Sequence, residues 1–294
     1  MILVITGNRV LLIISNVFVL QNEDIPNGIY FYNVINRMRK QNKRVFYTLL
    51  LVPIVSMIFL LYTVYVRSYY RYENFEQEPP TYTIYVLWTG TNEMSQDRKN
   101  AFENLKEVSE CNLILINPSN LSNYIKPEHP LHEAYQYLSE THKADYMRTY
   151  LMHFYGGGYS DIKKTTGSWK KVYDELLNSD KWICGYAETE SSGGIAYPPL
   201  IDKWRELIGN AAYICKPNTP LTNEWYNEMM SLLDTKLEQL KMHPASHPQD
   251  RAEDHTGYPI EWNEMLGRIF HRLAYKYKEY VMNTLPIPIF TKYR

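Results

Sequence analysis

Short apolar runs alternate with helix-like patterns along the chain from residue 83 onward. Thr83–Trp88 and Cys111–Ile116 are apolar runs of strand length, and polar or glycine-containing positions follow each of them. Between these runs, Gln96–Val108 brings Ala101 and Leu105 onto one face of a helix. A strand, a helix and a second strand joined by short links predict a parallel α/β sheet.

The same alternation continues toward the C-terminus. Helical periodicity predicts further helices near Leu131–Ser139, Lys143–Tyr155, Trp169–Leu177, Pro220–Leu240 and up to about Tyr277. Two more apolar runs predict strands over Trp182–Tyr186 and Ala211–Cys215, whereas polar stretches predict loops over Glu188–Pro199 and Lys241–Thr256. The tail Leu285–Pro288 is expected to be extended. The predicted fold class is therefore α/β, with a mixed, mostly parallel sheet flanked by helices.

An uncharged apolar run, Val45–Val66, precedes this region. At a rise of about 1.5 Å per residue, a helix of this length spans the roughly 30 Å hydrocarbon core of a membrane. A buried core helix is the alternative interpretation. Basic residues crowd the N-terminal side of the run at Arg37, Arg39, Lys40, Lys43 and Arg44. The positive-inside rule then predicts a cytosolic N-terminus and a single-pass, type II membrane protein.

These patterns predict four parts: a cytosolic segment (1–44), a transmembrane signal anchor (45–66), a stalk (67–80) and a globular domain (81–294). The first part is the least defined. Met1–Leu20 is either a hairpin around Thr6-Gly7-Asn8 or a poor signal-peptide core. Met38 opens a basic segment directly before the anchor, so the functional chain starts at either Met1 or Met38.

Composition narrows the classes of function. The formal net charge of −1 gives no support for a nucleic-acid partner. The 27 tyrosines suit either carbohydrate contacts or a membrane-interface belt. Cys111, Cys184 and Cys215 are odd in number and lack CxxC spacing, which excludes a zinc cluster and a disulfide framework but allows one disulfide. Neither GxGxxG nor P-loop spacing occurs, so dinucleotide oxidoreduction and ATP hydrolysis lack support.

The most informative stretch is His142–Thr166, which reads HKADYMRTYLMHFYGGGYSDIKKTT. Its first half is an amphipathic helix whose apolar face carries Ala144, Met147, Leu151 and Phe154. Asp145 and Arg148 are three residues apart and share a neighbouring face. Glycines then end the helix, and a short strand, Tyr159–Ile162, follows. Asp161 therefore lies where this strand gives way to polar residues.

This stretch resembles the glycosyltransferases that carry a DXD sugar-binding motif. Similar families are the initiating α-1,6-mannosyltransferases of fungi, the vertebrate α-1,4-sugar transferases and the capsular polysaccharide synthesis proteins, whose pattern is DxxRxxxLxxxGGxYxDxD. The chain supplies Asp145, Arg148, Leu151 or Met152, Gly157, Gly158, Tyr159 and Asp161. It departs from the pattern at the last position, where Lys163 replaces the second acid. The resemblance implies the glycosyltransferase A (GT-A) fold and transfer with retention of anomeric configuration.

The resemblance also implies roles for individual residues. Asp161 would be the catalytic carboxylate that touches a metal ion and the donor, and Asp145 and Arg148 would hold the hydroxyls of the donor sugar. The remaining donor-binding residues by this resemblance are Trp88, Thr89, Gly90, Gly157, Gly158, Tyr159 and Lys163. In open α/β sheets such ligands lie against the carboxyl ends of the strands.

The expected cofactor is Mn²⁺ or Mg²⁺, because a divalent cation stabilises the charge that develops on the departing diphosphate. Lys163 complicates this expectation, since a protonated lysine repels a cation and cannot ligate it. Two interpretations stay open. Either Asp161 holds the metal with a carboxylate from the loop after Pro244, or Lys163 itself supplies positive charge to the diphosphate.

The polar segment Asp250–Trp262 is the other candidate region. Related proteins have a histidine or an acid before the last helix, and this resemblance implies a catalytic role for His255 or Asp254. Trp262 is suited to stack on a sugar. The spacing of His243, His247 and His255 is too irregular for a zinc site, and solvated loop histidines are the plainer interpretation.

The sequence therefore predicts a membrane-anchored glycosyltransferase that uses a nucleotide-sugar donor and a glycan, glycolipid or polysaccharide acceptor. Residues 45–66 would contact the lipid bilayer, and the catalytic domain would face the Golgi or ER lumen or the outside of the cell. A catalytically inactive, glycan-binding relative is the first rival, and Lys163 is its main support. A membrane-anchored hydrolase is the second, although no pair of carboxylates suited to glycoside cleavage is recognisable.

Overall fold

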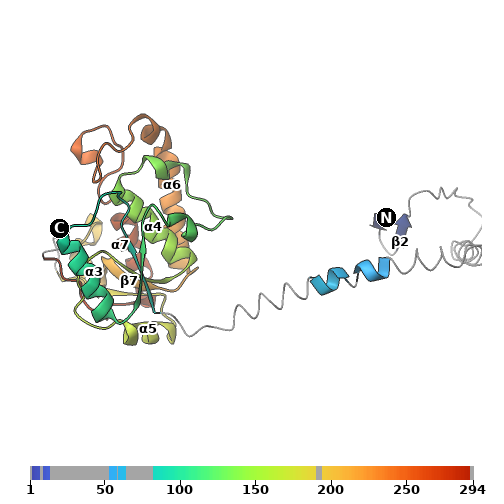
Figure 1. The fold of residues 1–294 in the computed structure, drawn as a ribbon, viewed down its shortest axis with the longest axis horizontal. Helices are drawn as coiled ribbons and strands as arrows, with labels where there is room; N and C mark the ends of the chain where they lie inside the picture. The colour runs from blue at the N-terminus through green and yellow to red at the C-terminus, as the bar shows by residue number, and fades with distance from the viewer. Residues whose placement is uncertain are drawn as a thin grey trace, which may run out of the picture. The chain divides into compact units, whose positions relative to one another are not determined.

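The structure is a computed structural model, and it describes residues 2–6, 9–13, 53–57, 59–63, 82–189 and 194–291 (Figure 1). The chain divides into two compact units, Met1–Glu78 and Pro79–Arg294.

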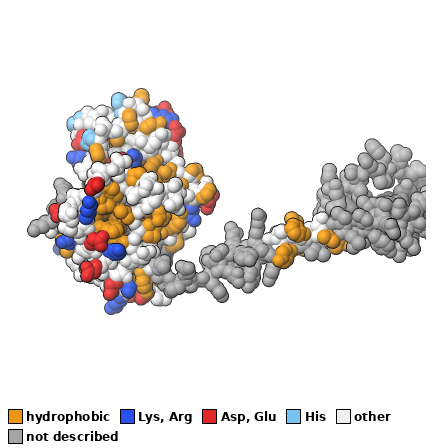
Figure 2. All heavy atoms as spheres, in the orientation of Figure 1, with side chains coloured by type: hydrophobic (Ala, Val, Ile, Leu, Met, Phe, Trp, Pro, Cys, Tyr) orange, Lys and Arg blue, Asp and Glu red, His pale blue; other side chains and the backbone are white. Residues whose placement is uncertain are grey.

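In the first unit, β1 (Ile2–Thr6) and β2 (Arg9–Ile13) pair antiparallel, with Thr6 opposite Arg9. The hairpin interpretation of this segment is therefore the one that the structure supports. Residues 53–57 and 59–63 are helical, and many of their apolar side chains are exposed, for example Phe59 and Leu60 (Figure 2).

None of the helices in the described part of the chain combines the length and the apolar character needed to cross a membrane. Most of the predicted anchor, Val45–Val66, lies outside the described residues, as does the stalk at 67–80. The membrane anchor stays a prediction.

The second unit is built on a six-stranded sheet with the order β4-β3-β5-β7-β6-β8. The strands are β3 (Thr83–Leu87), β4 (Asn112–Ile116), β5 (Gly157–Ser160), β6 (Ile183–Ala187), β7 (Ile208–Cys215) and β8 (Val281–Met282). Strands β4, β3 and β5 are parallel, and so are β6 and β8, whereas β7 runs antiparallel to both β5 and β6. The predicted mixed, mostly parallel α/β sheet is confirmed.

Helices cover both faces of this sheet (Figure 1). They are α3 (Gln96–Ser109), α4 (Glu140–Phe154), α5 (Lys170–Leu177), α6 (Pro220–Met242) and α7 (Gly267–Lys276). Buried residues of α3 and α5, such as Leu105 and Leu176, form one apolar cluster with the sheet. Buried residues of α4, α6 and α7, such as Leu151, Trp225 and Phe270, form a second cluster. The domain therefore has three layers, with an apolar core on each side of the sheet.

Most predicted boundaries agree with the structure to within a few residues. The region predicted as a helix near Leu131–Ser139 is instead a short 3₁₀ turn, Glu133–Tyr137. Strand β7 begins three residues earlier than predicted, and β8 was not predicted. Cys111, Cys184 and Cys215 are buried free thiols, so the disulfide that the sequence allowed does not form.

The turn from α4 into β5 requires glycine. Gly156 and Gly157 have φ values of 65° and 87°, which L-residues rarely adopt. A Cβ atom on Gly156 would also lie 2.5 Å from Cδ of Pro217. Gly158 follows in close contact with β3, where a Cβ atom would lie 3.0 Å from Cγ1 of Ile84. These glycines let β5 enter the middle of the sheet and carry Asp161 to its end.

Candidate active site

A cleft of about 1570 Å³ opens along the edge of the sheet where β3 and β5 end. Its walls come from residues after β3 and β5, the first half of α4, the start of β7 and the loop before α7. Small-molecule sites are typically about 300–1,000 Å³. This cleft is therefore large enough for a nucleotide-sugar together with part of an acceptor.

The strand register explains why distant residues meet at this edge. Ile84 pairs with Gly158 and Tyr85 with Tyr159, so β3 and β5 point the same way. The residues that follow the two strands, Trp88 and Asp161, consequently line the same cleft. Ligands of open α/β sheets bind at carboxyl ends of this kind.

Arg148 connects α4 to the ends of two strands. Its Nη2 atom lies 3.0 Å from Oδ1 of Asp145 and 3.5 Å from Oδ1 of Asp161. Its Nη1 atom donates to the carbonyl of Asn210 at the start of β7, at 3.0 Å. The guanidinium also lies 4.5 Å from the ring centroid of Tyr159. Arg148 is thus held in a single orientation from several sides.

Three groups contact the carboxylate of Asp161. Lys163 forms an ion pair with its Oδ2 atom, and the Tyr159 hydroxyl donates to its Oδ1 atom at 2.8 Å. Arg148 approaches the same Oδ1 atom. Burial would raise the pKa of Asp161, but Lys163 and Arg148 outweigh it and lower the pKa to about 2. Asp161 therefore stays ionised at physiological pH.

Four charged residues, Asp145, Arg148, Asp161 and Lys163, form what we call the strand-end cluster. The exposed fractions of their side chains are 6%, 9%, 25% and 8%, respectively. Burial raises the pKa of Asp145 to about 7, with Arg148 opposing the shift and Asp161 adding to it. The cluster holds two acids and two bases, so it is close to neutral when all four are ionised.

The residues after β3 form the neighbouring wall. Trp88, Thr89 and Gly90 all line the cleft. The Trp88 indole N–H donates to the carbonyl of Asn92 at 2.7 Å, and the Thr89 hydroxyl donates to the carbonyl of Glu140 at 2.6 Å. One hydrogen bond therefore stabilises the loop after β3 internally, and the other connects this loop to the start of α4.

Two glycines expected to bind the donor do not line the cleft. Gly157 and Gly158 lie within β5, where they pair with Cys215 and Ile214 of β7. Their small size serves the close approach of neighbouring strands described above. Tyr159, which follows them, does line the cleft and supports both Arg148 and Asp161.

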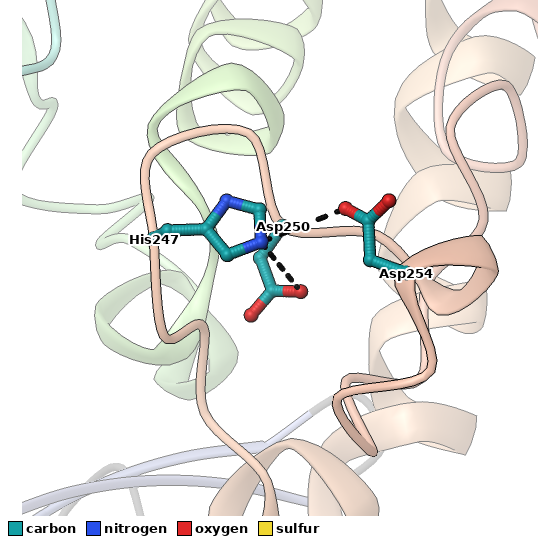
Figure 3. A group of neighbouring side chains, drawn as sticks. All are labelled: His247, Asp250 and Asp254. Atoms are coloured by element: carbon teal, nitrogen blue, oxygen red, sulfur yellow. Dashed lines mark ion pairs between the residues drawn. The ribbon is translucent and has the colours of Figure 1, made fainter.

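Another wall of the cleft includes part of a second polar group, His247, Asp250 and Asp254, which we call the loop cluster (Figure 3). The Nε2 atom of His247 lies 3.5 Å from Oδ1 of Asp250 and 3.6 Å from Oδ2 of Asp254. His247 and Asp254 line the cleft and are 45% and 27% exposed, whereas Asp250 is fully buried. This is the wall on which the sequence predicted a catalytic histidine or acid.

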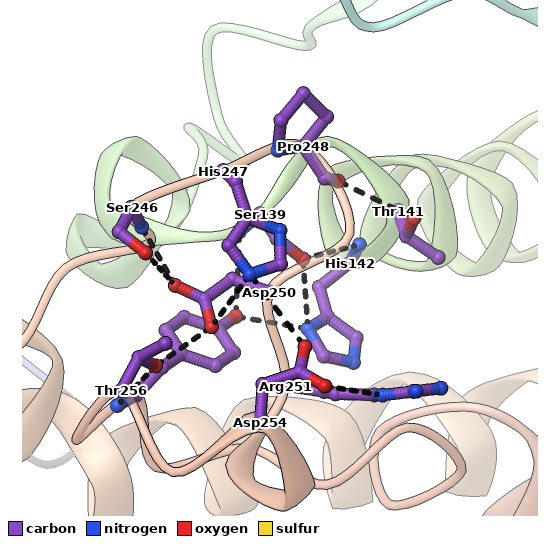
Figure 4. A network of polar contacts seen from close by, with 11 residues as sticks. Ser139, Thr141, His142, Ser246, His247, Pro248, Asp250, Arg251, Asp254 and Thr256 are labelled. Atoms are coloured by element: carbon purple, nitrogen blue, oxygen red, sulfur yellow. Dashed lines mark hydrogen bonds and ion pairs between the residues drawn. The ribbon is translucent and has the colours of Figure 1, made fainter.

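Neutral donors hold Asp250 in place (Figure 4). Its Oδ2 atom accepts from the Ser246 backbone N–H and hydroxyl, both at 2.7 Å, and its Oδ1 atom accepts from the Thr256 hydroxyl at 2.7 Å. Burial would raise the pKa of Asp250, but these hydrogen bonds and nearby His247 lower it. Asp254 meanwhile accepts from Nε of Arg251 at 3.1 Å.

The two residues predicted as catalytic in this loop differ in position. Asp254 lines the cleft, but His255 does not. His255 is exposed and has a left-handed φ of 57° at the end of a short 3₁₀ turn. His247 occupies the cleft instead. Trp262, expected to stack on a sugar, also lines the cleft, and the Arg251 guanidinium lies 5.3 Å from its ring centroid.

A divalent cation fits the strand-end cluster poorly. Both oxygens of Asp161 already form ion pairs with cationic partners, Oδ2 with Lys163 and Oδ1 with Arg148, and both partners would repel a metal ion. Among the described residues, the loop cluster is the group whose ligand atoms lie close enough to hold a metal, within 4.8 Å of one another. There Asp250 is fully engaged in hydrogen bonds, and Arg251 competes for Asp254.

Some residues of the cleft were not predicted from the sequence, among them Arg98 and Asn210, and His247 was interpreted as a solvated loop histidine. Arg98, at the start of α3, donates from Nη1 to the carbonyl of Ile162 at 3.0 Å, and nothing in its sequence context indicates this. Asn210 contributes its backbone carbonyl, which no side-chain pattern can reveal. Asp250 and Asp254 follow His247 by three and seven residues, but His255 lies in the same acidic loop, so this spacing does not single out His247.

Comparison with known proteins places these features in context. The sequence profile of the capsular polysaccharide synthesis protein family matches residues 60–231, more than half of the chain. No curated protein gives a significant match. The solved structures that match include one described as PaToxG glycosyltransferase, at 12% sequence identity, covering 66% of this chain and 69% of that chain with a TM-score of 0.38. That likeness is too weak to support a conclusion about function.

Proposed function

Because the chain belongs to the capsular polysaccharide synthesis protein family, we propose that it is a glycosyltransferase. It would move a sugar from a nucleotide-sugar donor onto a hydroxyl of a glycan, glycolipid or polysaccharide. One observation carries this proposal. Buried cations and carboxylates of the strand-end cluster line a single large cleft at the carboxyl ends of β3 and β5.

The donor is proposed to lie along the wall formed by β3 and β5. Trp88, Thr89 and Gly90 would contact the nucleoside, because they follow β3 at the sheet edge. Arg148 and Lys163 would face the diphosphate, since guanidinium and ammonium groups bind phosphate oxygens. Asp145 would accept hydrogen bonds from the hydroxyls of the donor sugar.

The acceptor is proposed to bind at the wall that carries the loop cluster. Trp262 offers an aromatic ring on which a sugar can stack. Asp254 and His247 lie on the same wall and are partly exposed, so either can accept the proton of an acceptor hydroxyl. His255 has no place in this arrangement, because it does not line the cleft.

The finer features follow as parts of the same proposal. The sugar would be a hexose, transferred with retention of configuration. Residues 45–66 would anchor the protein in the bilayer as a type II membrane protein, with the catalytic domain in the Golgi or ER lumen or outside the cell. The exposed apolar side chains in residues 53–63, among them Phe59 and Leu60, support a lipid partner.

The direct test is hydrolysis of donors by the full chain in detergent. A panel of UDP- and GDP-sugars is assayed for nucleotide release with the wild type, Asp161→Ala and the exposed control Asp202→Ala. We expect one donor to be cleaved, with a loss of about 10²-fold or more in Asp161→Ala and no change in the control. Absence of both release and donor binding across the panel would refute the proposal.

A second candidate function is an inactive, glycan-binding relative of these enzymes. Lys163 favours it, because the lysine takes the position of an acid and engages Asp161 directly. This alternative predicts binding of an oligosaccharide, measured by calorimetry, without release of nucleotide from any donor. Weaker binding in Trp262→Leu would place the oligosaccharide in the cleft.

A further inference from the structure

The replacement of an acid by Lys163 removes the excess negative charge that the strand-end cluster would otherwise have. With Asp145, Arg148, Asp161 and Lys163 ionised, the cluster has no net charge. An acid at position 163 would instead leave three carboxylates beside one guanidinium, an excess of two negative charges. A divalent cation would neutralise that excess, and the lysine removes the need for it.

The contacts of Lys163 indicate a fixed and specific position. Its ammonium pairs with Asp161 and lies 5.4 Å from the ring centroid of Phe290, a residue of the C-terminal tail that also lines the cleft. The Lys163 side chain is 8% exposed, so water screens its charge weakly. An ammonium has three N–H donors and can therefore hold carboxylate and phosphate oxygens at the same time.

We propose that Lys163, together with Arg148, does at the donor diphosphate what a divalent cation would otherwise do, so that the protein cleaves its donor without a metal at Asp161. This inference rests on the proposed glycosyltransferase function. In the step concerned, the bond from the anomeric carbon to the diphosphate oxygen breaks, and its electron pair stays on the diphosphate. The acceptor hydroxyl oxygen forms the new bond to that carbon, and its proton passes to His247 or Asp254.

Lys163 and Arg148 act on the leaving group in this step. The departing diphosphate gains one negative charge, and preorganised cations in a poorly hydrated site stabilise such charge without reorganising. Asp161 keeps both cations in place through its two oxygens. Its role here is that of a positioning residue rather than a metal ligand.

The first test measures Mn²⁺ binding by electron paramagnetic resonance of the full chain in detergent, without nucleotide. We expect no Mn²⁺ site that depends on Asp161 in the wild type, and one new site in Lys163→Asp that disappears in the double variant with Asp161→Asn. Lys164→Asp is the matched control, because Lys164 is adjacent and does not line the cleft. Background binding at the loop cluster is identified with His247→Ala.

The second test compares nucleotide release in Mn²⁺ and in chelator. We expect wild-type rates within about twofold of each other, and a loss of about 10²–10³-fold in Lys163→Met under both conditions. In Lys163→Asp we expect the same loss in chelator and at least tenfold recovery with Mn²⁺. Thermal unfolding of each variant verifies that it is folded.

The outcomes separate this inference from the proposed function. A wild type that loses activity in chelator, and binds Mn²⁺ through Asp161, would overturn the role of Lys163 but leave the glycosyltransferase intact. A wild type that cleaves no donor under any condition would overturn the proposed function. The Mn²⁺ titration would then still decide whether Lys163 excludes a metal from Asp161.

Discussion

The strand-end cluster and the loop cluster face the same cleft, yet they are stabilised in opposite ways. In the first, acids and bases compensate one another directly, and the pKa of Asp145 is raised whereas that of Asp161 is lowered. In the second, Asp250 is held by neutral hydroxyl and amide donors, while His247 and Asp254 stay partly exposed. The two walls therefore suit different partners.

The difference follows from the chemical groups in each cluster. In a group of ion pairs with low exposure, removal of one charge leaves another uncompensated, so the strand-end cluster is preorganised. It can accept an anion beside its cations. The loop cluster contains two acids and a histidine, and its exposed members can take up a proton or contact a hydroxyl group.

The largest effect is expected from Arg148→Met, which removes one cation from the strand-end cluster. It leaves Asp145 and Asp161 with only Lys163 as a compensating charge in a buried site. We expect the free energy of unfolding to fall by about 3–5 kcal/mol, seen as a decrease in Tm of roughly 10 °C.

Lys99→Met is the matched control for that experiment. Lys99 pairs with Glu93 at 3.3 Å, but the two side chains are 50% and 91% exposed. A surface pair of this kind contributes about 0–1 kcal/mol. Similar losses of unfolding free energy in Arg148→Met and Lys99→Met would show that the buried strand-end cluster contributes no more to stability than an exposed ion pair.

A smaller effect is expected from Asp250→Ala in the loop cluster. The substitution removes the acceptor of three hydrogen bonds and leaves Ser246 and Thr256 donors without it. We expect a loss of about 2 kcal/mol in the free energy of unfolding, measured by thermal unfolding beside the exposed control Asp202→Ala. A loss as small as that of the control would contradict the anchoring role of Asp250.

The stability that the Asp250 carboxylate contributes depends on pH in a defined direction. The pKa of Asp250 in the folded protein is lower than its ordinary value of 3.8. A carboxyl group of this kind stabilises the fold above its unfolded pKa, and the contribution is lost as the pH falls through the folded pKa. The difference in stability between wild type and Asp250→Asn should therefore be full at pH 7 and shrink below about pH 4.

The smallest effect is expected from replacing His247, which we compare with His255. His247 lines the cleft and His255 does not, although both lie in one loop. We expect His247→Ala to lower kcat/KM for the acceptor about tenfold, or roughly 1.4 kcal/mol, and His255→Ala to leave it unchanged. A loss in His255→Ala but not in His247→Ala would support the catalytic role of His255 that the sequence predicted.

Much of the fold could be predicted because strong local patterns determine it. The apolar runs at β3 and β4 are unambiguous, and the glycines after α4 mark a turn that only glycine can make. The first residues of β7, Ile208-Gly209-Asn210, lack an apolar pattern, so only its second half was predicted. The antiparallel direction of β7 depends on how the chain returns to the sheet, which periodicity does not encode.

The candidate site was predictable to the extent that it is contiguous in sequence. Asp145, Arg148, Asp161 and Lys163 fall within one recognisable motif, and the structure brings all four together. His247 and His255 could not be ranked from the sequence, because the choice depends on the path of a loop in three dimensions. Arg98 reaches the site from a separate helix and could be identified only from the structure.

The place of β5 in the sheet has a consequence for how the protein is made. Strand β5 lies between β3, which precedes it in the chain, and β7, which follows it. During synthesis β5 leaves the ribosome with one partner available and the other still to come. Until residues 208–215 emerge, the strand that leads into Asp161 has an open edge of the kind that recruits other chains. Translation of residue 215 is therefore the event that allows the sheet to close around the strand that leads into Asp161.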